Sequence, residues 1–254
     1  MTGYPKLLAP IDHVEPVPRR IRATLGGALV LDTVSATYVW EHPYYPQYYI
    51  PLGDIAPGLL VDEGESEQTS RGTARRHALR VGEIERPGAA LVYGDDAIAS
   101  VAGMAHFDWP ALDAWYEEEE QVFIHPRSPY TRVDALRSNR RIQVARDGHL
   151  LAESASPVMV FETGLPTRYY IARTDIDFTH LEPSETVTGC PYKGMTSAYW
   201  SFRDGQKIVP DLAWAYDFPT TALAQMAGMI AFYNERVDIT LDGVPIDRPT
   251  TPFT

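Results

Sequence analysis

The feature that most constrains the fold is an internal repeat. Residues 20–55 align without a gap with residues 141–176, at a constant offset of 121. Twelve of the 36 aligned positions are identical, and they include the pair Tyr49 and Tyr170. Self-similarity at a fixed spacing indicates a duplicated structural unit. The chain of 254 residues is therefore predicted to hold two copies of one module.

The module boundaries follow from where the repeat begins and where turn residues gather. The stretch HPRSPYTRVDALRSNRR is rich in proline and charge, which suits a connector between two modules. The predicted division is an N-terminal extension (1–19), a first module (20–124), a connector (125–140), a second module (141–246) and a C-terminal tail (247–254).

Both modules are predicted to be mainly β. Short β-branched or aromatic runs alternate with turn signals such as Gly26-Gly27 and Asp147-Gly148, a spacing typical of antiparallel barrels and sandwiches. Each module is also expected to close with one C-terminal α-helix. DWPALDAWYEEEE offers an N-cap and a first-turn proline, and TALAQMAGMIAFYN places apolar residues on one helical face. The predicted fold is thus two tandem small antiparallel β-barrel or β-tent modules, each with one C-terminal helix.

Charge and composition limit the classes of partner. The net charge of −12 argues against nucleic acid and anionic membranes, which require clustered Lys and Arg. No apolar run approaches the length of a membrane span, and the N-terminus lacks the apolar region of a signal peptide. A single cysteine fits a reducing cytoplasm. We therefore expect a cytoplasmic protein with a small-molecule ligand, and leave a homo-oligomer open.

The only cysteine, Cys190, lies in the stretch TGCPYKGMTSAYW. A nearby ammonium lowers the pKa of a thiol and favours the reactive thiolate, and Lys193 follows three residues later. Three interpretations stay open: a nucleophilic or redox-active thiol, a thiol that lines a pocket without chemistry, and a small residue packed before a turn. A metal site is not expected here, because structural zinc takes four ligands, usually in paired spacing.

Two carboxylates are repeated between the copies. Glu162 ends the apolar run VMVFE, where a buried carboxylate could act as an acid or a base. The alternative is an ion pair with Arg168 or Arg141. Asp175 is also repeated, in a first copy that lacks the CPYKG stretch, and this persistence favours a structural role for Asp175.

Aromatic residues and two arginines could complete a pocket. Trp214 and Tyr216 are two residues apart and share one face of a strand, whereas Tyr169 and Tyr170 face opposite ways. Aromatic stripes also build ordinary cores. Arginines of the connector could clamp a substrate anion or form salt bridges between the modules. The candidate ligand-binding residues are Tyr170, Tyr192, Trp200, Trp214, Tyr216, Arg127 and Arg132.

The second copy contains the motif series RYYI, T-x-CPYKG-x-x-x-YW, AWAY-x-x-P, AFYN and LDG. This series resembles the bacterial domain of unknown function 427 family, and EEEEQVFIHPRSPYTRVDALRSNRRIQV resembles the joint of its two-copy members. The resemblance covers nearly the whole chain after residue 20. It implies a compact β-rich domain, similar to the β-tent folds of the methionine sulfoxide reductase B and cereblon ligand-binding type. Those relatives often hold zinc on paired cysteine knuckles, which one cysteine cannot form.

The first copy departs from this pattern at the CPYKG stretch. Its counterpart falls within EQTSRGTARRHALRV, where Gln68 or a near neighbour stands at the position of Cys190. We therefore expect the first module to keep the fold and to have lost or changed the site. A nucleotidyltransferase label has been attached to such domains, but the sequence holds no phosphate loop and no paired metal carboxylates to support it.

The leading hypothesis is a small-molecule pocket in the second module that needs no cofactor. If it is an enzyme, Cys190 or Glu162 reacts and Lys193 is the electrostatic partner, in isomerase, lyase or hydrolase chemistry on a small metabolite. The competing hypotheses are a non-catalytic ligand sensor and a structural or protein-interaction module. Motifs of serine hydrolases, zincins, kinases and Rossmann enzymes do not occur in the sequence.

Overall fold

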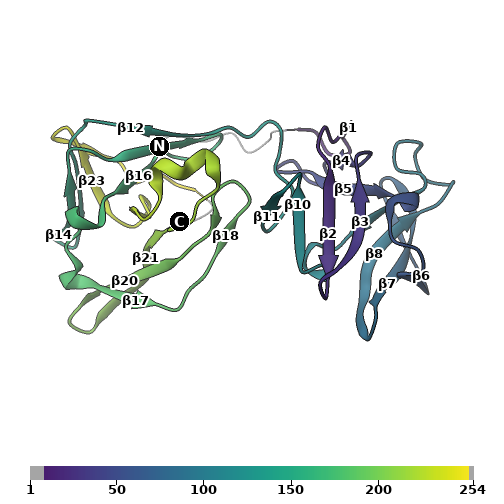
Figure 1. Ribbon diagram of the computed structural model, residues 1–254. Helices are drawn as coiled ribbons and strands as arrows, with labels where there is room; N and C mark the ends of the chain where they lie inside the picture. Colours follow the sequence, from purple (N-terminus) through teal and green to yellow (C-terminus); the bar gives the residue numbers. More distant parts are fainter. Residues whose placement is uncertain (1–8, 252–254) are drawn as a thin grey trace. The chain divides into compact units, whose positions relative to one another are not determined.

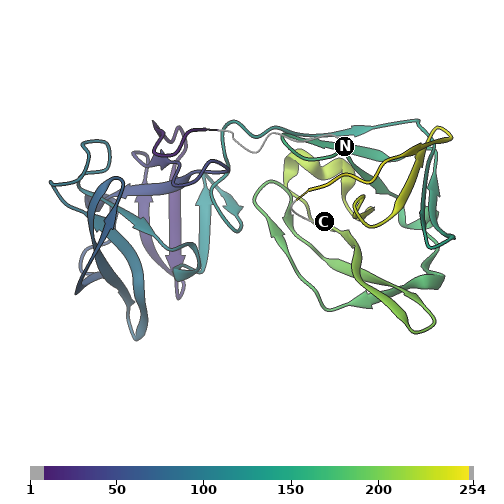
Figure 2. The same cartoon turned by 180° about the vertical axis from the view of Figure 1, so that it is seen from behind.

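A computed structural model describes residues 9–251. The chain divides into two compact units, one that ends at Ser128 and one that begins at Pro129. Figures 1 and 2 show both units as strand-rich bodies, seen from opposite sides. Each unit holds one seven-stranded and one four-stranded antiparallel sheet.

The strands of the first unit form two sheets. In spatial order, the larger sheet consists of β1 (Val14–Pro16), β4 (Thr37–Val39), β5 (Gln47–Pro51), β9 (Met104–Phe107), β8 (Ile84–Tyr93), β7 (Gly72–Val81) and β6 (Leu60–Thr69). The smaller sheet consists of β11 (Glu120–Val122), β10 (Ala114–Glu117), β2 (Ile21–Leu25) and β3 (Ala28–Thr33). Two 3-10 turns complete the unit, η1 (Leu52–Asp54) and η2 (Trp109–Ala111).

The second unit has the same plan, except that a short separate hairpin stands where the tip of the β6–β7 hairpin lies in the first unit. Its larger sheet consists of β12 (Val133–Arg137), β15 (Val158–Glu162), β16 (Arg168–Ile171), β22 (Ile230–Phe232), β21 (Lys207–Ala215), β20 (Ala198–Asp204) and β17 (Leu181–Ser184). The smaller sheet consists of β14 (His149–Ser154), β13 (Ile142–Arg146), β23 (Asp238–Leu241) and β24 (Val244–Ile246). The hairpin joins β18 (Gly189–Cys190) to β19 (Gly194–Met195), and the 3-10 turns are η3 (Arg173–Asp175), η4 (Phe178–His180) and η5 (Thr221–Met226).

The two units share one topology. Reading across the larger sheets, β1 corresponds to β12, and each further strand corresponds in turn, through to β6 and β17. The predicted N-terminal extension contains β1, and the predicted connector contains β12, so both segments supply an edge strand of a seven-stranded sheet. The repeat in the sequence therefore reflects a repeat of the whole fold.

Each larger sheet buries side chains on both of its faces. One face packs against the smaller sheet and forms the main core, which contains Tyr48 and Ile50 in the first unit and Tyr169 and Ile171 in the second. The other face, called here the outer face, carries a smaller apolar cluster that contains Tyr49 or Tyr170. This alternation follows from the two-residue period of a strand.

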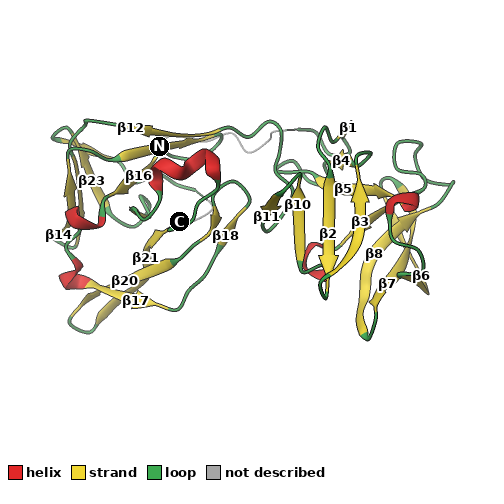
Figure 3. Cartoon of the chain, in the orientation of Figure 1, coloured by secondary structure: helices red, strands yellow, loops and turns green. Residues whose placement is uncertain are grey.

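The prediction of a mainly β, antiparallel fold is confirmed, but two finer predictions are wrong. Neither unit closes into a barrel, because within residues 9–251 each sheet ends in edge strands. In the same range the helical elements are all 3-10 turns of three to six residues, drawn red in Figure 3. No helix of the described chain is long and apolar enough to cross a membrane.

The predicted C-terminal helices fail for local reasons. The cap signals at Asp108 and Pro110 are used by the single turn η2, and the following AWYE is strand β10, hydrogen-bonded on both sides. In the second unit the helical pattern ends at η5. Gly228, with a φ of +69°, then turns the chain into β22, which lies between β16 and β21.

Candidate functional site

The candidate site lies on the outer face of the larger sheet in the second unit. Tyr170 on β16 faces this side and is fully buried, whereas its neighbour Tyr169 packs into the main core. Leu223 and Met226 of η5 cover the same face. Strand alternation therefore determines which residues form the floor of the site. The short turn η5, found where a helix was predicted, covers it.

The hairpin of β18 and β19 brings Cys190 and Lys193 to this face. Gly194, with a φ of +100°, allows the tight return of the chain, and the amide of Lys193 donates to the carbonyl of Cys190 at 3.3 Å. Thr220 fastens the hairpin to the segment before η5. Its amide donates to the Lys193 carbonyl at 3.1 Å, and its hydroxyl donates to the Tyr192 carbonyl at 2.7 Å.

A buried ion pair is the centre of the site. Lys193 Nζ donates a hydrogen bond to Glu162 Oε2, and the two side chains are only 10% and 9% exposed. The same Nζ lies 3.8 Å from Cys190 Sγ. The residue Cys190 as a whole is partly exposed, whereas the Lys193 and Glu162 side chains are nearly buried.

Phenol groups surround the ion pair. The Tyr170 hydroxyl accepts a hydrogen bond from Trp214 Nε1 at 3.2 Å, and Tyr216 packs in the same cluster. The Tyr199 hydroxyl shares a hydrogen bond of 2.8 Å with Thr188 Oγ1. The carboxylate, ammonium and thiol therefore lie among aromatic walls that are polar at their tips.

The electrostatics fix the resting protonation states. Burial raises the pKa of the Cys190 thiol, Lys193 opposes this shift and Glu162 adds to it. Burial acts to lower the pKa of Lys193, but Cys190 and Glu162 outweigh it and the net shift is upward. Burial raises the pKa of Tyr170 to about 12. At neutral pH the site therefore holds a charged lysine, a protonated thiol and a protonated phenol.

The first unit holds a chemically related group at the matching positions. Gly72 and Gly194 both have positive φ, of 122° and 100°, and the residues before them are Arg71 and Lys193. In strand register Thr69 faces Gly72, as Cys190 faces Gly194. The shorter first hairpin thus puts Thr69, the neighbour of Gln68, in the position of Cys190.

Contacts in the first unit follow the same plan. Arg71 donates to Glu41 at 3.1 Å and to the Tyr49 hydroxyl at 2.9 Å, and Tyr49 donates to Glu41 at 2.6 Å. The Arg71 side chain is 8% exposed and also pairs with Asp12. The first module therefore has a changed site, with arginine in place of lysine and a hydroxyl in place of the thiol.

Several sequence candidates lie away from the group around Cys190. Trp200 packs in the main core, on the other face of the larger sheet, with its ring under the Arg173 guanidinium. Arg127 belongs to the first unit, where it pairs with the buried Glu117 at 2.8 Å. The Arg132 side chain is 81% exposed and pairs with Asp134. Tyr192 contributes its backbone carbonyl, which accepts the hydrogen bond from the Thr220 hydroxyl.

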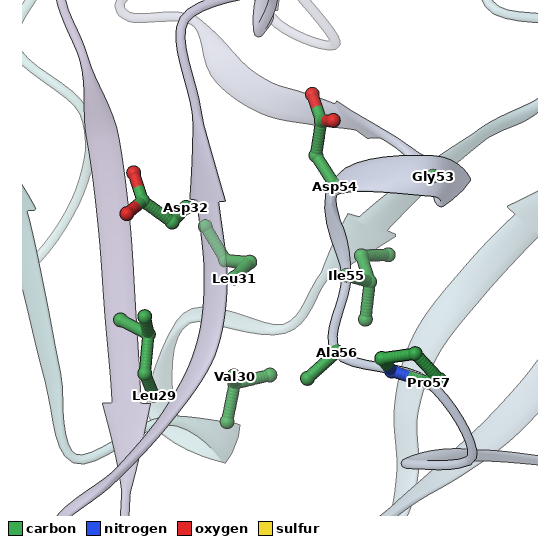
Figure 4. A pocket seen from close by; sticks show the side chains of 9 residues that line it. All are labelled: Leu29, Val30, Leu31, Asp32, Gly53, Asp54, Ile55, Ala56 and Pro57. Atoms are coloured by element: carbon green, nitrogen blue, oxygen red, sulfur yellow. The ribbon is translucent and has the colours of Figure 1, made fainter.

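Two concave regions lie elsewhere in the molecule. A groove of about 790 Å³ in the second unit is lined by Arg137, Ser138, Asn139, Arg140, Ser156, Val158, Ala172, Gln225 and Met229. A hollow of about 290 Å³ in the first unit lies between residues 29–32 and 53–57 (Figure 4). The acids of the hollow already have partners, since Asp32 pairs with Arg20 and Asp54 accepts from Thr33 at 2.6 Å.

Residues 13–118 and 134–243 each match the model of one family, described as Domain of unknown function (DUF427). The chain belongs to the DUF427 family. Its two matches fall one in each structural unit, so the protein contains two DUF427 modules in tandem. In a comparison with functionally curated proteins, nothing matched the chain.

Two sets of polar residues at the corresponding sites were not predicted from the sequence: Arg71 in the first module, and Thr188 with Tyr199 in the second. In the first DUF427 module, Arg71 was hidden because its hairpin is one residue shorter than that of the second module. The available signal was a cation followed by glycine in both copies. In the second DUF427 module, Thr188 and Tyr199 meet only because the hairpin folds over β20, a contact that no local pattern encodes.

Proposed function

We propose that the second DUF427 module binds a small metabolite over Cys190 and catalyses a reaction of the isomerase, lyase or hydrolase type. The observation that carries this proposal is the buried Lys193–Glu162 pair, held 3.8 Å from the thiol of Cys190, a residue that is partly exposed as a whole. Ionisable groups whose pKa is shifted by burial and by a specific charged partner are typical of functional sites.

Each residue has a role in this proposal. Cys190 contacts the ligand and gives or receives a proton or forms a covalent bond. The ammonium of Lys193, 3.8 Å from the sulfur, stabilises the thiolate, or a negative charge that develops on the ligand. Glu162 holds Lys193 in place and balances its charge. The walls are Tyr170, Trp214 and Tyr216.

A second candidate function is a ligand sensor that performs no chemistry. The groove of about 790 Å³ supports it, because ligand pockets commonly measure about 300–1,000 Å³. Arg137 lines this groove and makes no side-chain hydrogen bond or ion pair within the described residues, while Arg140 pairs with Asp242 at 2.6 Å. A metabolite with a carboxylate or phosphate suits such a wall.

The experiment is a screen of small metabolites against wild-type protein, with ligand binding followed by thermal shift and turnover by NMR. Cys190→Ala should abolish turnover and leave the ligand-induced shift largely intact, whereas Thr69→Ala, the matched change in the first module, should alter neither. Undiminished turnover in Cys190→Ala would refute the proposed catalysis. A ligand shift lost in Arg137→Ala, without turnover in any protein, would establish the sensor instead.

The β-tent class of the modules is also part of this proposal. It is supported by two open antiparallel sheets, of seven and four strands, which share one core in each unit.

A further inference from the structure

Three metal-binding side chains converge at one edge of the second module, away from Cys190. His149 begins β14, His180 ends η4 and Asp204 ends β20. One possible ligand atom from each residue lies within 4.8 Å of the others. Residues far apart in the sequence are thus brought together by three separate elements.

The spacing of the ligand atoms suits a transition metal ion. His149 Nε2 lies 3.4 Å from Asp204 Oδ2, and the two imidazole rings lie 3.9 Å apart between centroids. Nitrogen and oxygen ligands bind Zn²⁺ at about 2.0–2.2 Å in a tetrahedron, which places them about 3.3–3.6 Å from one another. The pair His149 and Asp204 already has this separation.

The hydrogen bond of His180 fixes which nitrogen can bind a metal. His180 Nδ1 lies 3.0 Å from the carbonyl oxygen of Arg203. A carbonyl only accepts, so Nδ1 carries the proton and Nε2 keeps its lone pair. A metal-bound histidine usually donates its second ring nitrogen to a carbonyl or carboxylate in this way. His180 is therefore held in the tautomer that a metal requires.

The first module has the same fold, so its residues at the positions of His149, His180 and Asp204 show which side chains the fold itself requires there. The strand registers give the residue of the first module that corresponds to each ligand. His149 corresponds to Ala28, because His149 pairs with Arg146 as Ala28 pairs with Leu25. Asp204 corresponds to Val81, because Asp204 pairs with Lys207 as Val81 pairs with Ile84. In the same way, Leu181 faces Phe202 as Leu60 faces Leu79, which aligns His180 with Leu59.

Three apolar residues in one module thus correspond to three ligating residues in the other. Leu59 and Val81 pack against the main core of the first module, so an apolar contact is sufficient to close the edge of this fold. A purely structural explanation for two imidazoles and a carboxylate at the same place is therefore weak.

We propose that His149, His180 and Asp204 bind one Zn²⁺ ion or a similar divalent transition metal ion, with water in the remaining position. Two imidazoles and one carboxylate match the ligand preference of such ions. The ion would tie β14 of the smaller sheet to β20 of the larger sheet. Cys190 takes no part in this site.

The surroundings permit entry of a cation. The side chains of His149 and Asp204 are 34% and 47% exposed, so an ion reaches the site from solvent. The two cations of the hairpin that holds Asp204 already have carboxylate partners, since Lys207 pairs with Asp147 at 2.7 Å and Arg203 pairs with Glu182 at 2.5 Å. Phe202 packs against both imidazoles and holds the rings in place.

The test is a calorimetric titration of the tag-free, chelator-treated full chain with Zn²⁺, repeated with Co²⁺ to follow its visible absorption. Wild type should bind one ion per chain. His180→Leu, which installs the residue of the first module and should fold, is expected to weaken binding at least about tenfold. Asp204→Val should do the same.

Two control variants separate this site from other ligands. His77→Ala removes a partly exposed histidine of the first module, and Cys190→Ser removes the only thiol; both should bind Zn²⁺ like wild type. Equal affinity in wild type and His180→Leu, with circular dichroism confirming that both are folded, would overturn the proposal. So would the absence of saturable binding by wild type.

Discussion

Cys190 and Thr69 occupy corresponding positions, each in a hairpin whose cation pairs with a carboxylate, Glu162 in the second module and Glu41 in the first. A thiol ionises near pH 8.5, whereas an aliphatic hydroxyl does not ionise in the normal pH range of proteins. Only the second module can therefore form an anionic nucleophile at this position. A cation–carboxylate pair is present in both modules, so the thiol is the group that makes the second site different.

The reactivity of Cys190 should depend on Glu162. Glu162 raises the pKa of the thiol, so Glu162→Gln should lower that pKa and increase the thiolate fraction at a given pH. We expect iodoacetamide to alkylate Cys190 about threefold to tenfold faster at pH 8 in this variant, which corresponds to a pKa lowered by about half a unit to one unit.

The control for this prediction is Glu41→Gln, the matching change in the first module, which should leave the alkylation rate as in wild type. Rates are measured by mass spectrometry between pH 6 and 10, so that the midpoint of each profile gives the pKa. A midpoint in Glu162→Gln equal to or above that of wild type would contradict the electrostatic account.

Among the elements, strands were predictable from the sequence and helices were not. Residues 168–171 and 21–25 have β-branched and aromatic patterns that agree with their sheet positions. The segment 221–230 has an apolar spacing close to that of a helix, yet its buried residues Leu223 and Met226 belong to a 3-10 turn and its buried Ile230 begins strand β22. Periodicity alone does not reveal that the next residues must enter a sheet as a central strand.

The candidate site was predictable only where its residues share one motif. Cys190 and Lys193 lie in a single hairpin, and Glu162 ends a strand that the repeat had already identified. Trp200 is an aromatic residue that could form a pocket wall, but it faces the main core together with Phe202, and residue type alone does not reveal which face of a sheet a side chain joins. The partners of Arg127 depend on the tertiary fold and leave no local signal.

The tight hairpins of the two sites should respond differently to the same substitution. Gly72 and Gly194 both have positive φ, which costs a residue with a side chain about 1–2 kcal/mol. A Cβ on Gly194 would lie 3.5 Å from the nearest atom, an ordinary contact, whereas a Cβ on Gly72 would lie 2.7 Å from the backbone of Ala97. Gly72→Ala should therefore lower the free energy of unfolding by more than Gly194→Ala.

Urea unfolding followed by circular dichroism measures both changes. Gly82→Ala is a suitable control, because Gly82 also has a positive φ, of 58°, but a Cβ there meets no atom within 4 Å. Equal losses in Gly72→Ala and Gly82→Ala would show that the close approach to Ala97 carries no energetic cost.

At the scale of the whole molecule, each module has its own main core and its own buried ion pairs. In the second module, Arg168 and Glu235 form two hydrogen bonds of 2.7 Å, with the carboxylate fully buried. Burial acts to raise the pKa of Glu235, but hydrogen bonds from Arg168 and Thr251 outweigh it and the pKa is lowered. The ionised pair therefore stabilises the folded second module.

The sign of its pH dependence follows from linkage. Because the pKa of Glu235 is lower in the folded than in the unfolded chain, its contribution is present above the unfolded value of about 4.3. That contribution is lost as the pH falls through the folded value. The second module should therefore lose stability below about pH 4.3 through this carboxylate.

Arg168→Met tests whether the modules unfold separately. It leaves Glu235 buried without its cation, which typically costs about 3–5 kcal/mol, whereas Arg132→Met breaks only an exposed pair worth about 0–1 kcal/mol. Peptide-resolved amide hydrogen exchange should show faster exchange across residues 129–251 in Arg168→Met, with residues 9–128 unchanged. Arg132→Met should exchange like wild type throughout. Faster exchange in both units would mean that the duplicated modules fold as one cooperative body.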